Sequence, residues 1–184
     1  MTTEEIFSKL STHSIRGMMV HDQLSNYYDF LGLSGFKRCH EYHYLHETHG
    51  HSELNHFYIS RYNKLVEDAQ VDSSSVIPAN WYKYMRQDVD ASTKREAVES
   101  GLRAWVDWEH ETKAALREAY KALSDLGKVS AAEYVCDMIR DNDEEIKAAE
   151  KMLLDLETVN YDMTYIVEMQ DRLHKKYKKK LKTV

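Results

Sequence analysis

A carboxylate and an imidazole stand three residues apart in Glu53-Leu54-Asn55-His56, inside a histidine-rich run from residue 42 to residue 60. In an α-helix, side chains three residues apart project in similar directions, one turn apart along the axis. Glu53 and His56 could therefore bind one metal ion from the same helix face. Most helices keep their inward face apolar, because burial of an unpaired charge is strongly unfavourable. A polar seam of this kind favours a bound metal ion.

The first predicted helix, from about residue 3 to residue 33, carries a histidine at the edge of its apolar stripe. The stripe recurs every three or four residues, and its members are Ile6, Leu10, Val20, Leu24, Tyr27, Tyr28 and Leu31. His21 borders this stripe, whereas Asp22 falls nearly opposite it. We therefore expect His21, and not Asp22, to point into the protein near Glu53, with Tyr28 beside it on the same face.

Two later segments also carry polar residues in apolar or inward-facing positions. Glu109 lies in the middle of an apolar seam, and Asn142 is central in the next seam, with Glu145 one turn further on. If four helices bring these positions to one level, six side chains become candidate metal ligands: His21, Glu53, His56, Glu109, Asn142 and Glu145. Carboxylates and neutral imidazoles suit iron, manganese or zinc.

Segments with helical periodicity account for most of the chain. The predicted helices span about residues 3–33, 37–68, 93–126 and 131–158, followed by a tail helix at about 161–182. The periodicity lapses only from about residue 69 to residue 93, which contains a run of serines and the one proline. A four-helix bundle with parallel second and third helices needs such a long crossover. The sequence predicts an all-α, antiparallel four-helix bundle, in a single domain over residues 1–184.

Composition narrows the classes of function. The 184 residues include only 6 glycines and 1 proline, as in helical proteins, and the net charge of −6 argues against a general nucleic-acid-binding surface. Cys39 and Cys136 lie far apart in the sequence, in no metal-ligand spacing, and no apolar run approaches the roughly 20 residues of a membrane span. We expect a cytoplasmic protein that makes no membrane contact. The lysine-rich end, residues 175–180, suits a solvated helix terminus, with docking on a polyanion as the alternative.

Several runs together resemble the ferritin and bacterioferritin family over roughly residues 18–156. They are Glu53-Leu54-Asn55-His56, Glu99-Ser100-Gly101-Leu102, Glu109 ahead of Leu116-Arg117-Glu118-Ala119, and Met138-Ile139-Arg140-Asp141. The resemblance implies a ferritin-like bundle in which two helices each supply a Glu and the other two each supply Glu-x-x-His to a di-iron site. Glu53 then matches the bridging carboxylate of the second helix, His56 its histidine, and Glu109 the carboxylate of the third helix.

The chain departs from the family pattern on the first and fourth helices. Where the family has Glu-x-x-His, this sequence has Asn142 and Glu145 in the two ligand positions. Aligning Tyr28 with the family's tyrosine places His21 where a glutamate belongs, and an alternative alignment selects Asp22. His21 and Asn142 stand in place of family carboxylates, and Glu145 stands in place of the histidine, so the resemblance implies a second metal position weaker than the first.

Three classes of protein fit these residues. The first is a ferroxidase or iron-storing protein that oxidises Fe(II) with dioxygen and assembles into a homo-oligomeric shell. The second is a small-molecule oxidase, oxygenase or peroxidase that uses the same metals. The third is a non-catalytic helical protein with a degenerate site, because acid–histidine pairs three residues apart are common on solvated helices.

The remaining histidines have simpler interpretations. We expect His46 and His49 beside the ligands or along a hydrated channel, and His40, His43 and His51 at the surface.

Overall fold

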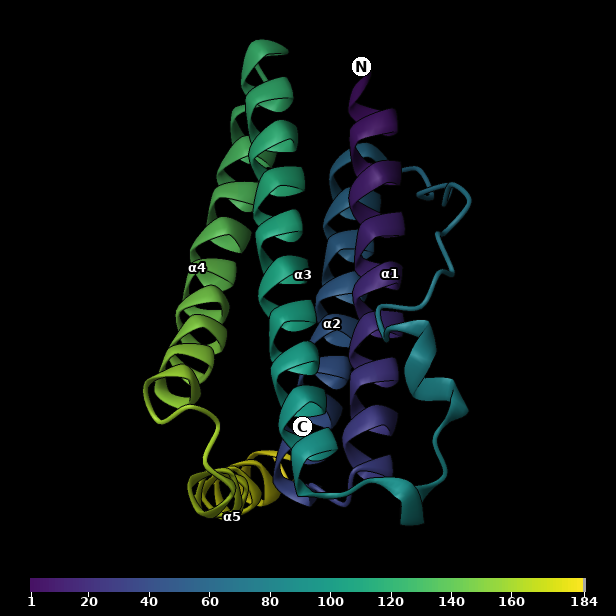
Figure 1. Ribbon diagram of the computed structural model, residues 1–184. Helices are drawn as coiled ribbons and strands as arrows, with labels where there is room; N and C mark the ends of the chain where they lie inside the picture. The colour runs from purple at the N-terminus through teal and green to yellow at the C-terminus, as the bar shows by residue number, and fades with distance from the viewer. Residues whose placement is uncertain (184) are drawn as a thin grey trace.

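The computed structural model describes residues 1–183, which form five α-helices and no β-strand (Figure 1). The helices are α1 (Thr3–Phe30), α2 (Ser34–Tyr62), α3 (Ala91–Asp125), α4 (Val129–Thr158) and α5 (Met163–Lys180). Each begins and ends within a few residues of the predicted bounds, except that α2 ends earlier, at Tyr62. Val184 lies outside the described residues. Within the described chain, no helix is both long enough and apolar enough to cross a membrane.

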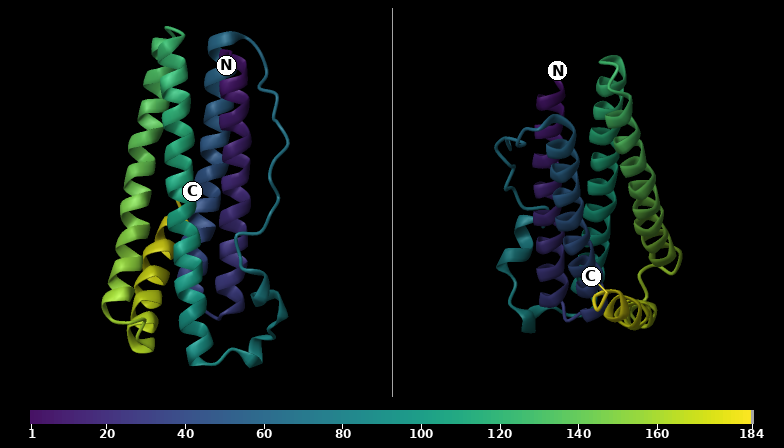
Figure 2. Two further views of the ribbon diagram at one scale, coloured as in Figure 1. Left: turned by 45° about the horizontal axis from the view of Figure 1, so that its top comes forward. Right: turned by 180° about the vertical axis from the view of Figure 1, so that it is seen from behind.

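The four long helices form two antiparallel hairpins, α1 with α2 and α3 with α4, packed side by side (Figures 1 and 2). A long crossover, residues 63–90, runs down the outside of α1 and returns the chain to the end of the bundle from which α2 started. As a result α2 and α3 run in the same direction. This is the predicted architecture, and the long crossover has the predicted role.

Tight turns close both hairpins. Gly32, at φ +71°, ends α1, and Gly127, at φ +66°, ends α3. Glycine adopts this left-handed conformation without the steric cost that a side chain would bring. Only three residues, Leu31 to Leu33, separate α1 from α2. The short turn aligns the two helices so that residues equally far from Gly32 lie beside each other.

Apolar side chains form two clusters, one toward each end of the bundle. The cluster near the α1–α2 turn includes Leu24, Tyr28, Phe36 and Trp105 and also takes in side chains from α5. The other, which includes Phe7, Leu54, Leu123 and Val135, fills the opposite end. Polar side chains occupy the stretch between these clusters.

Helix α5 packs across the start of α2 at the lower end of the bundle (Figure 1). The approach is close at Gly35, where an added Cβ would lie 1.8 Å from the backbone oxygen of Gln170. Tyr177 of α5 is buried against Tyr42, with ring centroids 5.4 Å apart. The tail predicted as a fifth helix is therefore part of the packed structure.

The crossover is held against α1 by aromatic side chains on its short 3₁₀-helix, Ala79–Lys83. Trp81 is buried with its ring centroid 5.7 Å from that of Tyr27. The hydroxyl of Tyr27 also donates a hydrogen bond to the backbone oxygen of Ala97, at 3.1 Å, and so joins α1 to α3.

Removal of that hydroxyl should measurably weaken the junction between the hairpins. We expect Tyr27→Phe to lower the free energy of unfolding by about 1 kcal/mol, because it leaves the buried Ala97 carbonyl without this donor. Urea denaturation measures the change. Tyr120→Phe is a matched control, since Tyr120 is 41% exposed, and it should change stability by less than about 0.5 kcal/mol. Equal stability of Tyr27→Phe and the natural protein would contradict the proposed role of this bond.

Candidate metal centre

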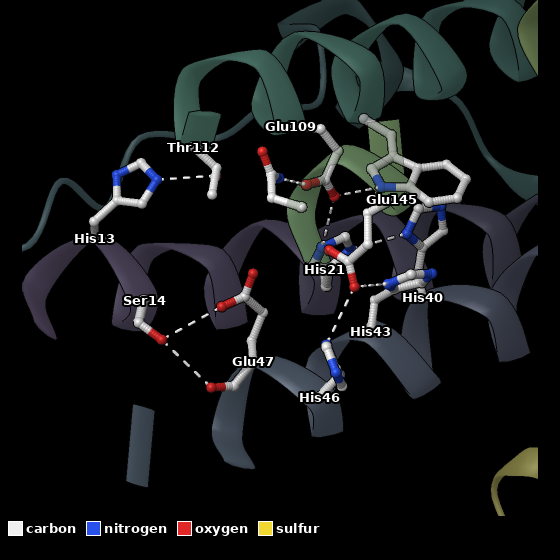
Figure 3. Close-up of polar contacts among 12 residues, drawn as sticks. His13, Ser14, His21, His40, His43, His46, Glu47, Glu109, Thr112 and Glu145 are labelled. Atoms are coloured by element: carbon white, nitrogen blue, oxygen red, sulfur yellow. Dashed lines mark hydrogen bonds and ion pairs between the residues drawn. The ribbon is translucent and has the colours of Figure 1, made fainter. Parts of the chain in front are cut away.

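Two buried histidines from the first hairpin form one side of a polar centre (Figure 3). His21 on α1 and His40 on α2 are both fully buried, and their Nδ1 atoms lie 3.1 Å apart. One ring must donate a proton in this contact and the other must accept it. Burial lowers the pKa of His21 and holds the pKa of His40 well below its usual value. Both imidazoles are therefore neutral near pH 7, the form that binds metals.

The second hairpin contributes a buried carboxylate, Glu109 on α3. Its Oε1 accepts a 2.7 Å hydrogen bond from the indole nitrogen of Trp105, and its Oε2 accepts one of 2.8 Å from the amide of Asn142. His21 Nε2 lies 3.6 Å from Glu109 Oε1. Glu109 is thus stabilised by donors from its own hairpin and faces a histidine of the other.

A second carboxylate, Glu145 on α4, bridges to α2. Its Oε1 lies 3.4 Å from Nδ1 of His43 and 3.1 Å from Nδ1 of His46. Burial alone would lower the pKa of His43, but contacts with Cys39 and Glu145 hold it well above its usual value. Burial would likewise raise the pKa of Glu145, but hydrogen bonds from His43 and His46 bring it well below its usual range. In this arrangement Glu145 is an anion held by His43 and His46.

A third carboxyl group, Glu47 on α2, points toward the same interior (Figure 3). Ser14 Oγ donates to its Oε2 at 3.3 Å, and the space for its carboxyl exists because α1 has Gly17 there. An added Cβ at Gly17 would lie 2.8 Å from the Glu47 carboxyl carbon. Burial, together with the charges of Glu145 and Glu109, raises the pKa of Glu47 to about 8. Glu47 is therefore protonated at neutral pH.

One more polar pair lies beside Glu47, between α1 and α3. His13 Nε2 and the hydroxyl of Thr112 are 2.9 Å apart, and the His13 ring stacks on Trp108 with centroids 4.5 Å apart. Burial, and secondarily the charge of Arg16, lowers the pKa of His13 to about 4. This imidazole is neutral under physiological conditions.

The donor set of the centre fits a metal ion in part. Buried ring nitrogens without a hydrogen-bond partner include Nε2 of His21, His40 and His43. Each offers a lone pair to a metal ion when its ring carries no proton at that nitrogen. Ligands at right angles around a metal, each about 2.1 Å from it, are about 3 Å apart, close to the separations of 3.1 to 3.6 Å between the paired side chains. However, in residues 1–183 no three His, Cys, Asp or Glu side chains already converge as a metal site. Binding would require a metal to replace some of these hydrogen bonds.

The sequence prediction that Glu53 and His56 face this centre is wrong. Glu53 has a side chain 62% exposed and pairs with His49 of its own helix at 3.3 Å, and His56 is also exposed. The inward residue between them is Leu54, which is fully buried. Because each residue turns the helix by 100°, the one-residue step from Leu54 to Glu53 moves the carboxylate out of the interior.

The other predicted positions lie largely where we expected them. His21 is buried and Asp22 is exposed, which confirms the choice between them. Glu109 and Asn142 are buried, and Glu145, with a side chain 18% exposed, also faces inward. These are placements in the fold, and metal binding by any of them remains a prediction.

Tyr28 and His49 differ in how well they match their predicted positions. Tyr28 stacks on His40, with the two rings 3° from parallel, so it lies beside the centre. His49 has a side chain 68% exposed and lies apart from the buried histidines.

Sequence reasoning missed His40, His43 and Glu47, and it placed the first two at the surface. His40 is in fact 0% exposed, and His43 is 5% exposed. A signal for them exists in the spacing of α2, where Phe36, His40, His43, Glu47, Leu54 and Tyr58 recur at intervals of three, four and seven. This series is a regular inward stripe, interrupted by polar residues in its middle.

Solved structures of ferritins are similar to this chain in their arrangement of helices. The open-pore ferritin of the hyperthermophilic archaeon Archaeoglobus fulgidus aligns with a TM-score of 0.77 over 94% of both chains, at 13% identity. A humanized archaeal ferritin aligns with a TM-score of 0.74 over 94% of both chains, also at 13% identity. A variant of PmFTN soaked in iron aligns with a TM-score of 0.74 over 91% of this chain and 96% of that chain, at 12% identity.

The sequence matches no protein-family model, and no curated protein matches it. Likeness at 12 to 13% identity shows the fold. The four-helix bundle, the long crossover and the C-terminal helix together give this chain the ferritin-like fold that the sequence resemblance implied.

Proposed function

We propose that this protein binds Fe(II) between its two helical hairpins and oxidises it with dioxygen. The observation that supports the proposal is the buried cluster of His21, His40 and His43 with Glu109 and Glu145, in which three imidazoles have ring nitrogens without partners. Imidazole and carboxylate together suit iron. The ferritin-like fold, by analogy, supports iron chemistry at this site. Manganese and zinc suit the same donors.

The charge of the cluster favours one strongly bound Fe(II). The carboxylates Glu109 and Glu145 supply two negative charges, which balance one divalent ion once the metal has displaced the proton by which His43 pairs with Glu145. A second Fe(II), as in the di-iron site of the family, would need a further carboxylate, and Glu47 is the nearest candidate. Since the pKa of Glu47 is raised to about 8, binding there would first have to displace a proton. We therefore propose one tight iron position and a second, weaker one.

The oxidation itself requires little from the protein beyond ligands. Each Fe(II) loses one electron, and two ions together reduce one dioxygen to hydrogen peroxide with uptake of two protons. We expect slower oxidation than in a ferritin with its full set of carboxylates, because fewer anions stabilise Fe(III).

Anaerobic Fe(II) titration followed by exposure to air tests the proposal. We expect Glu109→Ala and His43→Ala to weaken Fe(II) binding by about 10- to 100-fold, the range for loss of groups that hold or orient a metal ligand. Glu53→Ala and His56→Ala are matched controls on exposed positions of α2 and should bind and oxidise iron like the natural protein.

Circular dichroism and urea denaturation of each variant separate loss of ligands from loss of fold. If the natural protein binds no iron above background, the centre is a hydrogen-bonded polar core. If Glu53→Ala abolishes binding while His43→Ala does not, iron binds outside the centre proposed here.

We also propose that the chain assembles as a homo-oligomer, as the ferritin-like fold suggests. Sedimentation velocity would distinguish a shell of many subunits from a monomer or dimer. A monomer that still oxidises iron would fit the small-molecule oxidase class better than iron storage.

A further inference from the structure

A cavity of about 240 Å³ opens beside the buried centre, between α2 and α4. One water molecule occupies roughly 10–15 Å³ on a comparable measure, so the cavity is much larger than a metal ion with its ligands requires. Its inner end is formed by Glu47, Asn142 and Glu145, and its walls include Ser14 and Thr112. The space therefore suits a small organic molecule.

Side chains of α2 and α4 contact each other at both ends of the cavity. At one end Phe57 of α2 stacks on Tyr134 of α4, with ring centroids 4.2 Å apart. At the other end Glu145 bridges to His43 and His46. The cavity opens between these two contacts.

The charged residues that line the cavity favour a cation. Five carboxyl side chains face it, namely Glu47, Glu53, Asp137, Asp141 and Glu145, and among the described residues no lysine or arginine lines it. Of the five carboxyl groups, Glu47 is protonated at neutral pH and Asp137 also pairs with Arg140, which lies outside the cavity lining. Of the three lining histidines, His13 is neutral, His46 pairs with Glu145 and His49 pairs with Glu53. A recess with carboxylates and low-dielectric walls concentrates cations.

A buried acceptor without a partner marks the inner end as a binding site. Oδ1 of Asn142 has no hydrogen-bond partner, although the residue is only 5% exposed and lines the cavity. An unpaired buried acceptor is unfavourable. An ammonium group carries three N–H donors and no acceptor, which matches three acceptors: Asn142 Oδ1, the Glu145 carboxylate and the carbonyl oxygen of the protonated Glu47.

The spacing of the carboxyl groups indicates a ligand with two cationic ends. Glu47 and Glu53 on α2 are six residues apart, about 9 Å along the helix at 1.5 Å per residue. Glu145 and Asp137 on α4 are eight residues apart, about 12 Å. Apolar side chains of Leu10, Leu116 and Met138 also line the cavity, and Asp141 lies between Asp137 and Glu145 on α4. The lining thus combines apolar side chains with acidic ones along its length.

From this lining we infer that the cavity between α2 and α4 binds a linear aliphatic diamine. One ammonium group sits at Asn142, Glu47 and Glu145, the methylene chain lies against Leu116 and Met138, and the second ammonium group faces Glu53 and Asp137. The binding does not require iron, so it goes beyond the proposed function and is tested without metal, but it shares Glu145 and Glu47 with the proposed iron positions, and iron and diamine should compete.

Calorimetric titration in EDTA, with four probes of similar length, tests the inference. We expect 1,6-diaminohexane to bind more tightly than hexylamine, and 1,6-hexanediol and hexanoate not to bind. Glu53→Gln combined with Asp137→Asn should weaken the diamine by roughly two- to five-fold, the range for exposed ion pairs, and should leave hexylamine unchanged. Asn142→Leu should weaken both amines.

Glu96→Gln, an exposed carboxylate on α3 far from the cavity lining, is the matched control and should leave all affinities unchanged. Glu53 and Asp137 are exposed, so their variants should fold normally, as circular dichroism will check. Diol binding as tight as diamine binding would overturn the inference, as would an unchanged diamine-to-hexylamine ratio in the double variant. Binding of Mn²⁺ alone, with no diamine binding, would assign the cavity to metal instead.

Discussion

Glu47→Gln should make the protein progressively more stable than the natural form as the pH rises from 5 to 9. Burial and the neighbouring carboxylates raise the pKa of Glu47 from 4.5 to about 8 in the folded state. An unfolded chain therefore loses this proton above pH 4.5, whereas the folded protein keeps it until about pH 8. Because the unfolded state binds fewer protons in this range, the natural protein loses stability as the pH rises.

The glutamine variant lacks this ionisation, so its advantage should grow from about 1 kcal/mol or less at pH 5 to as much as about 5 kcal/mol at pH 9. Urea denaturation at a series of pH values measures it. Glu53→Gln, on the same helix but with an exposed side chain, should show no pH-dependent difference. Parallel stability curves for the natural protein and Glu47→Gln would mean that Glu47 is ionised and solvated in the folded state.

Gly35→Ala should detach α5 from the bundle. The new Cβ would lie 1.8 Å from the backbone oxygen of Gln170, and backbone cannot turn aside as a flexible side chain can. Overpacking typically destabilises by 1–3 kcal/mol, and a clash with backbone belongs at or above the upper end. We expect a loss of about 3 kcal/mol or more, which corresponds to roughly 6–12 °C in the unfolding temperature of a chain this size.

Gly50→Ala is the matched control, because it lies in the same helix with no atom within 4 Å of an added Cβ. It should stabilise the protein by about 0.5–1 kcal/mol, since alanine favours helix over glycine. Differential scanning calorimetry compares the two variants, and hydrogen exchange locates the loss. If Gly35→Ala melts like Gly50→Ala, the contact of α5 with α2 is looser than the structure shows.

The fold could be predicted from the sequence because it depends on long-range periodicity. Stripes such as Leu24, Tyr28 and Leu31 repeat over many turns, so an error of one residue at an end leaves the helix recognisable. The crossover was also evident, since the lapse in periodicity spans more than twenty residues. A pattern that repeats over many turns identifies a helix even where a single residue fits the pattern poorly.

The candidate centre was only half predictable, because it depends on the rotation of α2 and on its alignment with α1. Glu53-x-x-His56 was a familiar motif, but the inward stripe passes through Leu54. The hairpin turn is a second feature of the sequence that separates Glu53 from His21. A turn at Gly32 places His21 beside His43, eleven residues away on either side. Glu53 lies ten residues further along α2, about 15 Å away at 1.5 Å per residue.

The polar centre is shared between the two hairpins, and this sharing bears on how they find their correct alignment. The first hairpin holds His21, His40 and His43, and the second holds Glu109 and Glu145. A slip of one helical turn, about 5.4 Å, would still place apolar side chains of one hairpin against apolar side chains of the other. It would also separate both carboxylates from their imidazoles inside the protein, where an unpaired charge is strongly unfavourable. Misaligned packing of the two hairpins is therefore less stable than the native packing. The centre thus specifies one register for the bundle whether or not a metal is bound.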